Sequence, residues 1–244
     1  MNAHGTLPDG RSPALLPVHG HRPPHGATAA VLLLPGGREH SLKPPARLDP
    51  PALRMRPFAT AIAHATAQAH VLVARVRYRH RGWNGDRADP VADTRRALAE
   101  LRTLTGPVPV VLVGHSMGAR AALRAAEDPQ IAGVVALAPW CPPGEPTAHL
   151  EGRTVIALHD ERDRVTSAAD TWSYLTRAQH DGARSMGISM PPGGHAMIRH
   201  ARQWHRTTAR LAAALVGLAP LPSTPPWNGR PHTLRSSAPR STRR

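Results

Sequence analysis

The sequence predicts an α/β fold with a mainly parallel central sheet and helices on both faces. Short runs of consecutive apolar residues alternate along the chain with longer segments of helical composition. Such unbroken runs are typical of strands that are buried on both faces of a parallel sheet. The chain has 244 residues, of which 41% are hydrophobic, so it can bury one generous core. Strand–helix alternation then favours helices packed on both sides of the sheet.

The apolar runs predict the strands, which are expected at residues 29–35, 71–78, 108–113, 131–140, 154–160 and 185–190, with a further short strand at 14–18. Composition and capping residues predict helices at 57–70, 89–106, 116–128, 167–180 and 196–217. Asp89-Pro90 suits a helix start, since aspartate caps the first turn and proline fits it, and Gly106 suits the end. Either Thr166 or Ser167 caps the helix that ends near His180.

Proline, glycine and charge define three regions of the chain. Residues 1–26 are rich in Pro, Gly and His and are expected to form a flexible arm. Residues 27–219 are expected to form the folded domain, and residues 220–244 a basic, proline-broken, disordered tail. The histidines within 19–26 are joined by no acidic or cysteine ligand, so no metal site is expected there, and no cofactor is required elsewhere.

The net charge is +15, with 31 lysines and arginines against 16 acidic residues. The arginines are scattered rather than gathered in one element, which argues against a nucleic-acid footprint, although the surface field favours anionic substrates. Cys141 is the only cysteine, so no internal disulfide can form. The N-terminus lacks a secretory apolar core, and the longest apolar run, 27–34, is too short to span a bilayer. The protein is therefore expected to be soluble and cytoplasmic, with its oligomeric state left open.

One short motif carries the chemistry. Gly114-His115-Ser116-Met117-Gly118 follows an apolar run and leads straight into an alanine-rich helical segment. Glycines on both sides of a serine indicate a backbone that turns sharply where a side chain would collide. In parallel sheets ligands bind at the carboxyl ends of strands, which is where this serine falls.

A serine hydroxyl needs a base, and the base works best when a carboxylate orients it. The strand at 154–159 is followed by Asp160, Glu161 and Asp163, any of which could be that carboxylate. The last strand is followed by a glycine-rich loop that carries His195. The order serine, acid, histidine, each at its own strand end, matches one known sheet architecture. His115 adjoins the serine but points elsewhere in a sharp turn, and Cys141 has no partner histidine.

From about residue 29 to 217, the chain resembles the α/β-hydrolase family, in particular small lidless bacterial carboxylesterases and dienelactone-hydrolase-like enzymes. The motif around Ser116 matches the G-x-S-x-G nucleophile elbow, so the resemblance implies that Ser116 is the nucleophile. It implies Asp163 as the acid, if Asp160 replaces the usual loop glycine, and His195 as the base. It also implies an oxyanion hole formed by the backbone N–H of Met117 and a second N–H from the early glycine turn.

The sequence leaves the second oxyanion donor and the substrate open. The glycine turn reads Pro35-Gly36-Gly37-Arg38 where many relatives have His-Gly, and Gly37 is the first choice of donor with Arg38 second. Arg38 and Trp83, in loops that leave strands on the same sheet edge, and Trp140, at a strand end, are candidates to line a substrate pocket. The alternative is a solvated-loop role for Arg38 and Trp83 and a packing role for Trp140.

Only residues 141–153 connect two strands between which relatives often carry a helical lid, so an open pocket is expected. The expected function is hydrolysis of a small or short-chain carboxylic ester or thioester through an acyl-enzyme on Ser116. The alternatives are another acyl-transfer chemistry on the same triad, such as an acyltransferase or a peptidase, an idle fold used as a binding module, and a nucleic-acid binder using the basic tail.

Overall fold

The computed structural model of the chain describes residues 12–18, 26–46, 48–221 and 231–232. The strands are β1 (Leu15–Pro17), β2 (Ala29–Leu34), β3 (Val71–Val76), β4 (Val110–His115), β5 (Ile131–Leu137), β6 (Thr154–His159), β7 (Arg184–Ser189) and β8 (Pro231–His232). The helices are α1 (Pro50–Arg54), α2 (Arg56–Ala65), α3 (Asp89–Thr105), α4 (Met117–Ala125), α5 (Ala168–His180) and α6 (Ala201–Leu215), with short 3₁₀ turns at Gly85–Arg87 and Ala148–Leu150.

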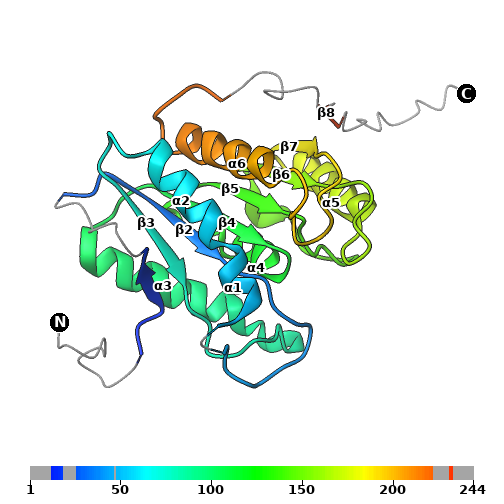
Figure 1. Cartoon of the computed structure of the whole chain (residues 1–244), viewed down its shortest axis with the longest axis horizontal. Coiled ribbons are helices and arrows are strands. Elements are labelled where there is room, and N and C mark those ends of the chain that lie inside the picture. Colours follow the sequence, from blue (N-terminus) through cyan, green and yellow to red (C-terminus); the bar gives the residue numbers. More distant parts are fainter. Residues whose placement is uncertain (1–11, 19–25, 47, 222–230, 233–244) are drawn as a thin grey trace, which may run out of the picture.

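The strands form one sheet in the order β1-β3-β2-β4-β5-β6-β7-β8 (Figure 1). The six inner strands are parallel, and the short edge strands β1 and β8 run antiparallel to their neighbours. Parallel strands bring all their carboxyl ends to one edge of the sheet, so the loops that follow β4, β6 and β7 meet there. The α/β class with a mainly parallel sheet is confirmed.

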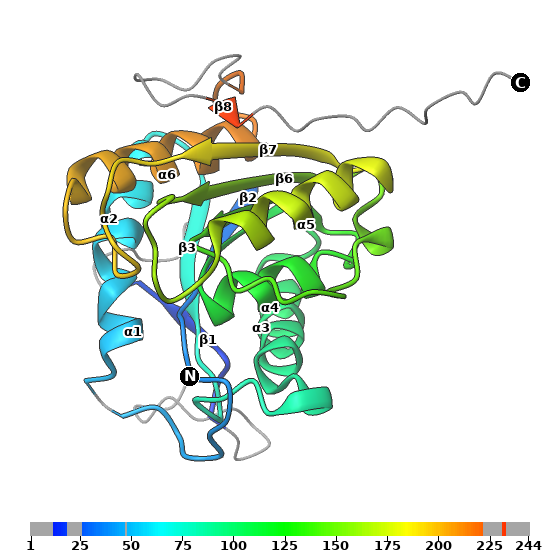
Figure 2. The ribbon, with the colours of Figure 1, turned by 90° about the vertical axis from the view of Figure 1, so that its right-hand side faces the viewer.

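Helices cover both faces of the sheet, as Figure 2 shows edge-on. Buried side chains of α2 and α6 pack on one face, and those of α3, α4 and α5 pack on the other. Strands β2, β4 and β6 are buried at every position, which accounts for their uninterrupted apolar sequences. No helix in the described residues is long and apolar enough to cross a membrane.

The final helix begins later than expected. The predicted start at residue 196 is wrong, because α6 begins at Ala201. Met197 and His200 both have a φ of 54°, and this left-handed backbone interrupts any helix through residues 196–200. Residues 196–200 therefore extend the loop that carries His195.

The expected arm and tail are described only in part. Residues 1–11, 19–25, 222–230 and 233–244 lie outside the described residues, so most of what was expected for both regions falls there. Within the expected arm, Leu15–Pro17 pairs with β3, in line with the short strand expected at 14–18. Within the expected tail, Pro231–His232 pairs with β7. The boundaries at residues 27 and 219 remain predictions.

Candidate active site

Ser116 occupies a strained turn between β4 and α4. Its backbone has φ 54° and ψ −119°, which a residue with a side chain rarely adopts. A Cβ on Gly114 would lie 2.4 Å from the carbonyl oxygen of Gly118, and one on Gly118 would lie 2.3 Å from that of Pro35. Both contacts are too short for any other residue type. The two glycines therefore let α4 pack against β4 and β2 while the serine is held outward at the strand end.

The side chain of Asp163 meets that of His195. Asp163 Oδ2 lies 2.8 Å from His195 Nδ1, and the carboxylate is fully buried. A carboxylate accepts, so Nδ1 carries the proton and donates it to Asp163. The neutral imidazole then presents an unprotonated Nε2, which is the atom that can take up a proton.

The other two acids of the same loop have different partners. Asp160 Oδ2 accepts hydrogen bonds from the backbone N–H of Gly193 at 2.8 Å and of Gly194 at 2.9 Å. Glu161 Oε1 accepts from the indole N–H of Trp172 at 3.1 Å. Asp160 therefore holds the backbone of the histidine loop and Glu161 holds a helix, and only Asp163 contacts the imidazole.

Hydrogen bonds keep Asp163 ionised despite its burial. Burial alone would raise its pKa, but hydrogen bonds from His159, from His195 and from the backbone N–H of Val165 outweigh that effect and hold the pKa well below its usual range. The hydroxyl of Thr166 lies 3.1 Å from Asp163 Oδ2 and adds a further polar contact. The negative charge is therefore present at any pH where the histidine can act as a base.

His115 supports the histidine loop rather than acting as a base. Its Nε2 donates to the backbone carbonyl of His195 at 2.9 Å, and the two rings lie with centroids 4.8 Å apart. Burial lowers the pKa of His115 to about 3, so the ring stays neutral in the physiological range. The sequence reading that His115 is not the base agrees with this geometry, but its role as a loop anchor was not foreseen.

Arg54 is another residue that sequence reasoning missed. It ends α1 and donates from Nε to the carbonyl of Ala196 and from Nη2 to that of Met197, the latter at 2.5 Å. These bonds tie the segment between β2 and α2 to the loop just after His195. No motif marks Arg54, because its partners are carbonyls more than 140 positions away in the sequence.

The glycine turn after β2 lies against the elbow. A Cβ on Gly37 would come within 2.3 Å of the Met117 side chain, so Gly37 and Met117 are in close contact. The backbone N–H of Arg38, the alternative donor, already donates a hydrogen bond to the carbonyl oxygen of Arg81 at 2.8 Å. Met117 begins α4, and the first N–H groups of a helix have no acceptor within it. These observations favour Gly37 over Arg38 as the partner of Met117 in an oxyanion hole.

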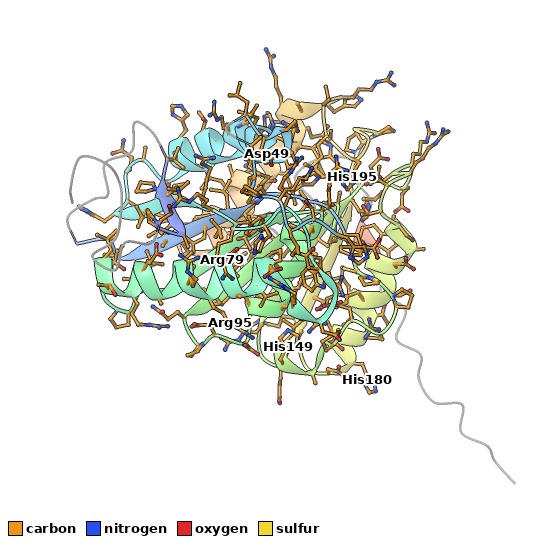
Figure 3. The ribbon with its side chains drawn as sticks, turned by 90° about the horizontal axis from the view of Figure 1, so that it is seen from below. Asp49, Arg79, Arg95, His149, His180 and His195 are labelled. Carbon is orange, nitrogen blue, oxygen red and sulfur yellow. The ribbon has the colours of Figure 1, made fainter. Side chains whose placement is uncertain are left out.

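Ser116 and His195 open onto one cavity of about 600 Å³, within the range of small-molecule sites. The other walls come from the glycine turn, from α1 and from the acid and histidine loops, and include Gly36, Gly37, Pro50, Pro51, Leu53, Val165 and Ile198. The hydrogen-bond contacts of the His195 side chain are with Asp163 and Thr166, both at Nδ1, and none joins it to the Ser116 hydroxyl. Catalytic contacts of this kind often tighten only when substrate binds. Figure 3 shows His195 on the side of the sheet that carries α1 and α2.

The three residues expected to line the substrate pocket are not among the residues that line this cavity. Trp83 and Trp140 instead flank the guanidinium of Arg120, at 3.9 and 4.5 Å from the ring centroids. Arg38 forms a backbone bridge to Gly82. For Trp140 this is the packing alternative, whereas Trp83 is buried and so does not have the solvated-loop role that was its alternative. Cys141 is buried, which raises the pKa of its thiol and makes it a poor nucleophile.

No helical lid follows β5. In the described chain between β5 and β6 the only helical element is the 3₁₀ turn Ala148–Leu150, as the short connection predicted. Part of the cavity wall comes instead from α1, through Pro50, Pro51, Leu53 and Arg54, and this contribution was not expected from the sequence.

Comparisons with known proteins agree with this geometry. The family described as "Alpha/beta hydrolase family" matches residues 31–235, so the chain belongs to that family. Among curated proteins the sequence finds no match.

Several solved structures share the fold. An esterase/lipase from an uncultured bacterium has a TM-score of 0.59 and 16% identity, covering 83% of this chain and 84% of its own. Est1E from Butyrivibrio proteoclasticus has a TM-score of 0.58 and 10% identity, covering 83% and 93%. An alpha-beta serine hydrolase homologue from Coxiella burnetii has a TM-score of 0.55 and 15% identity, covering 80% and 88%. At such identities the likeness establishes the fold.

Proposed function

We propose that the protein is a serine hydrolase that cleaves a carboxylic ester or thioester of a small or short-chain substrate. The observation that carries the proposal is the 2.8 Å contact between Asp163 Oδ2 and His195 Nδ1, at a cavity that His195 shares with Ser116. A buried carboxylate, an imidazole and an outward serine at three strand ends have the roles that acyl transfer needs.

In the first half-reaction the Ser116 oxygen attacks the acyl carbon of the substrate. His195 Nε2 takes the hydroxyl proton, and the charge of Asp163 stabilises the imidazolium that forms. The carbonyl oxygen becomes an oxyanion, which the backbone N–H groups of Met117 and Gly37 stabilise. The tetrahedral intermediate then expels the alcohol or thiol, which leaves with the proton from His195.

The second half-reaction repeats the sequence with water. His195 removes a proton from a water molecule as the water oxygen bonds to the acyl carbon. The bond from the acyl carbon to Ser116 Oγ then breaks, and the imidazolium of His195 returns its proton to that oxygen. The products are a carboxylic acid and the free serine, and no cofactor takes part. Each oxyanion donor is worth about 3 kcal/mol of transition-state stabilisation, so both N–H groups matter.

The walls of the cavity support a small substrate. Val165 and Ile198 stand at its rim with exposed fractions of 70% and 72%, so apolar surface is offered to the ligand beside the nucleophile. The described chain between β5 and β6 has no helical lid to cover a long acyl tail over the cavity. Short acyl groups therefore fit this site better than long ones.

Labelling with a fluorophosphonate probe tests the mechanism. The wild type is expected to gain one adduct, which peptide mapping assigns to Ser116, and to hydrolyse 4-nitrophenyl acetate. Ser116→Ala and His195→Ala are expected to lose labelling and turnover. Ser173→Ala and His180→Ala, both at exposed positions on α5, are the matched controls and keep both.

Two results would overturn the proposal. A folded wild-type protein that takes up no label and turns over none of a panel of acetate to octanoate esters is not a serine hydrolase. Labelling at Ser116 that survives in His195→Ala removes His195 from the role of base. Transfer of the acyl group to an added alcohol in preference to water would instead make the protein an acyltransferase.

A further inference from the structure

A second cavity, of about 520 Å³, shares Gly36 and Leu53 with the catalytic cavity. We call it the arginine pocket, because six arginines line it: Arg56, Arg75, Arg77, Arg79, Arg81 and Arg96. Asp49 is the only acidic residue among its lining residues. Figure 3 shows Asp49 on the same side of the sheet as His195, while Arg95, His149 and His180 lie on the opposite side.

Four of these arginines come from β3 and the chain just after it. Arg75 lies in β3, which ends at Val76, and Arg77 follows two positions later while still bonded to Ala14, so side-chain alternation places these two on one face. Arg79 and Arg81 lie in the bends that follow and line the same pocket. The intervening Val76 belongs to the core, with an exposed fraction of 3%.

Nearby carboxylates neutralise only some of these charges. Asp93 pairs with Arg79 at 2.6 Å and with Arg96 at 3.2 Å. Asp49 pairs with Arg81 at 3.2 Å.

Three arginines of the pocket remain without a carboxylate. Arg56, Arg75 and Arg77 form no ion pair with any described residue. Glu100 stands near Arg77, but its two oxygens accept the backbone N–H groups of Ala14 and Leu15, at 2.9 and 2.8 Å.

Two buried donors at the arginine pocket have no acceptor. Arg77 Nη2 and the hydroxyl oxygen of Tyr78 are both buried and form no hydrogen bond with the described part of the chain. Burial of the Arg75 and Arg77 guanidinium groups also lowers their pKa values. An unpaired, desolvated donor costs stability unless something binds to it.

We propose that the arginine pocket is a binding site for an oxyanion group, a carboxylate or a phosphate. The planar fork of a guanidinium donates two parallel hydrogen bonds to such a group, which arginine does better than any other side chain. Arg75 and Arg77 supply the free charges, and Arg56 adds a third from the start of α2. The source of the oxyanion is either the acidic end of a substrate that reaches past Gly36 to Ser116, or a free anion.

Titration calorimetry with inorganic phosphate tests the pocket without any need for turnover. The wild type is expected to bind phosphate, and Arg77→Gln and Arg75→Gln are each expected to weaken binding at least tenfold. Arg210→Gln removes an exposed arginine of α6 that lines neither cavity and is expected to change binding less than twofold. Arg77→Lys keeps the charge and loses the fork, and is expected to bind at an intermediate level.

A kinetic comparison distinguishes the two sources. The mono-4-nitrophenyl ester of glutaric acid and 4-nitrophenyl valerate differ in a terminal carboxylate at nearly equal length. If the oxyanion belongs to the substrate, the acidic ester has the lower KM, phosphate competes with it alone, and Arg77→Gln abolishes the preference. If the oxyanion is free, phosphate binds with the same arginine dependence but the two esters behave alike. An inactive protein that still binds phosphate would leave this proposal standing while the proposed function fails.

The proposal is overturned if the wild type binds no phosphate, or if Arg77→Gln and Arg210→Gln weaken binding equally. Thermal melts and circular dichroism of every variant check that each one is folded. Arg77→Gln removes a desolvated, unpaired cation, so its melting temperature is expected to equal or exceed that of the wild type. A purely structural role for Arg77 would instead lower it.

Discussion

Asp160 and Asp163 stand three residues apart in one loop and serve the same histidine in different ways. Asp163 contacts the imidazole through Nδ1, whereas Asp160 binds the backbone N–H groups of Gly193 and Gly194. One carboxylate is therefore placed to set the proton position on the ring, and the other sets the position of the loop that carries it. The comparison teaches that a shared residue type and nearly shared location do not imply a shared task.

The largest expected effect is at Asp163. Asp163→Asn and Asp163→Ala are both expected to lower kcat by about 10⁴-fold. Neither an amide nor a methyl group can hold the required histidine tautomer and stabilise the imidazolium as a carboxylate does. Steady-state hydrolysis of 4-nitrophenyl acetate measures this. A loss below about tenfold in Asp163→Asn would contradict the assigned role.

Asp160 is expected to respond differently to the two substitutions. Asp160→Asn keeps an oxygen acceptor for the loop N–H groups and is expected to lose about tenfold in kcat. Asp160→Ala removes the acceptor of the buried Gly193 N–H and of the partly buried Gly194 N–H. It is therefore expected to lose about 3 kcal/mol of unfolding free energy and about 10²-fold in kcat. Urea unfolding and ester turnover measure both quantities. If Asp160→Asn and Asp160→Ala lost equal amounts of kcat and of unfolding free energy, Asp160 would not act by accepting hydrogen bonds from the loop, and its assigned difference from Asp163 would be wrong.

His115 anchors the same loop from the other side, at the carbonyl of His195, and is expected to show itself in the pH dependence of stability. Its pKa is about 3 in the folded protein and 6.5 unperturbed, so the unfolded chain binds more protons between these values. Stability is therefore lost as the pH falls below 6.5, by about 2 kcal/mol between pH 7 and pH 5.

His115→Asn is the variant that tests this, since it keeps an N–H donor and removes the titration. Its unfolding free energy is expected to fall less than that of the wild type between pH 7 and pH 5, by about the same 2 kcal/mol. Urea unfolding at both pH values measures the difference. Parallel pH profiles for the two proteins would mean that the folded-state pKa of His115 is not depressed.

The smallest expected effect is at Glu161, the third acid of the loop. Glu161→Gln keeps an acceptor for the Trp172 indole, so kcat is expected to change less than about twofold. This variant is the matched control for the other two acids. A large loss of turnover with the melting temperature unchanged would give Glu161 a part in the chemistry.

Residues with local consequences could be predicted from the sequence. The glycines around Ser116 indicated the turn because Gly114 is crowded by its near neighbours Gly118 and Ala119, and the inner strands followed from unbroken apolar runs. The division of labour among Asp160, Glu161 and Asp163 could not be predicted from the residues alone, since it depends on which oxygen reaches a loop more than 30 positions away. The late start of α6 could not be predicted either, because nothing in the composition marks Met197 and His200 as residues with positive φ. The position of α1 was hidden for a similar reason, since its contacts are made with backbone carbonyls.

The walls of the catalytic cavity have a consequence for how specificity changes over time or under directed selection. Part of the cavity wall comes from residues 50–54, while the proposed reacting groups come from the loops after β4, β6 and β7. Substitutions at Pro50, Pro51 or Leu53 are expected to reshape this wall without disturbing the proposed reacting groups. Arg54 sets the limit on such exchange, because its hydrogen bonds to Ala196 and Met197 tie the wall to the loop after His195. Libraries that diversify residues 50–53 and keep Arg54 are therefore the shortest route to new substrates.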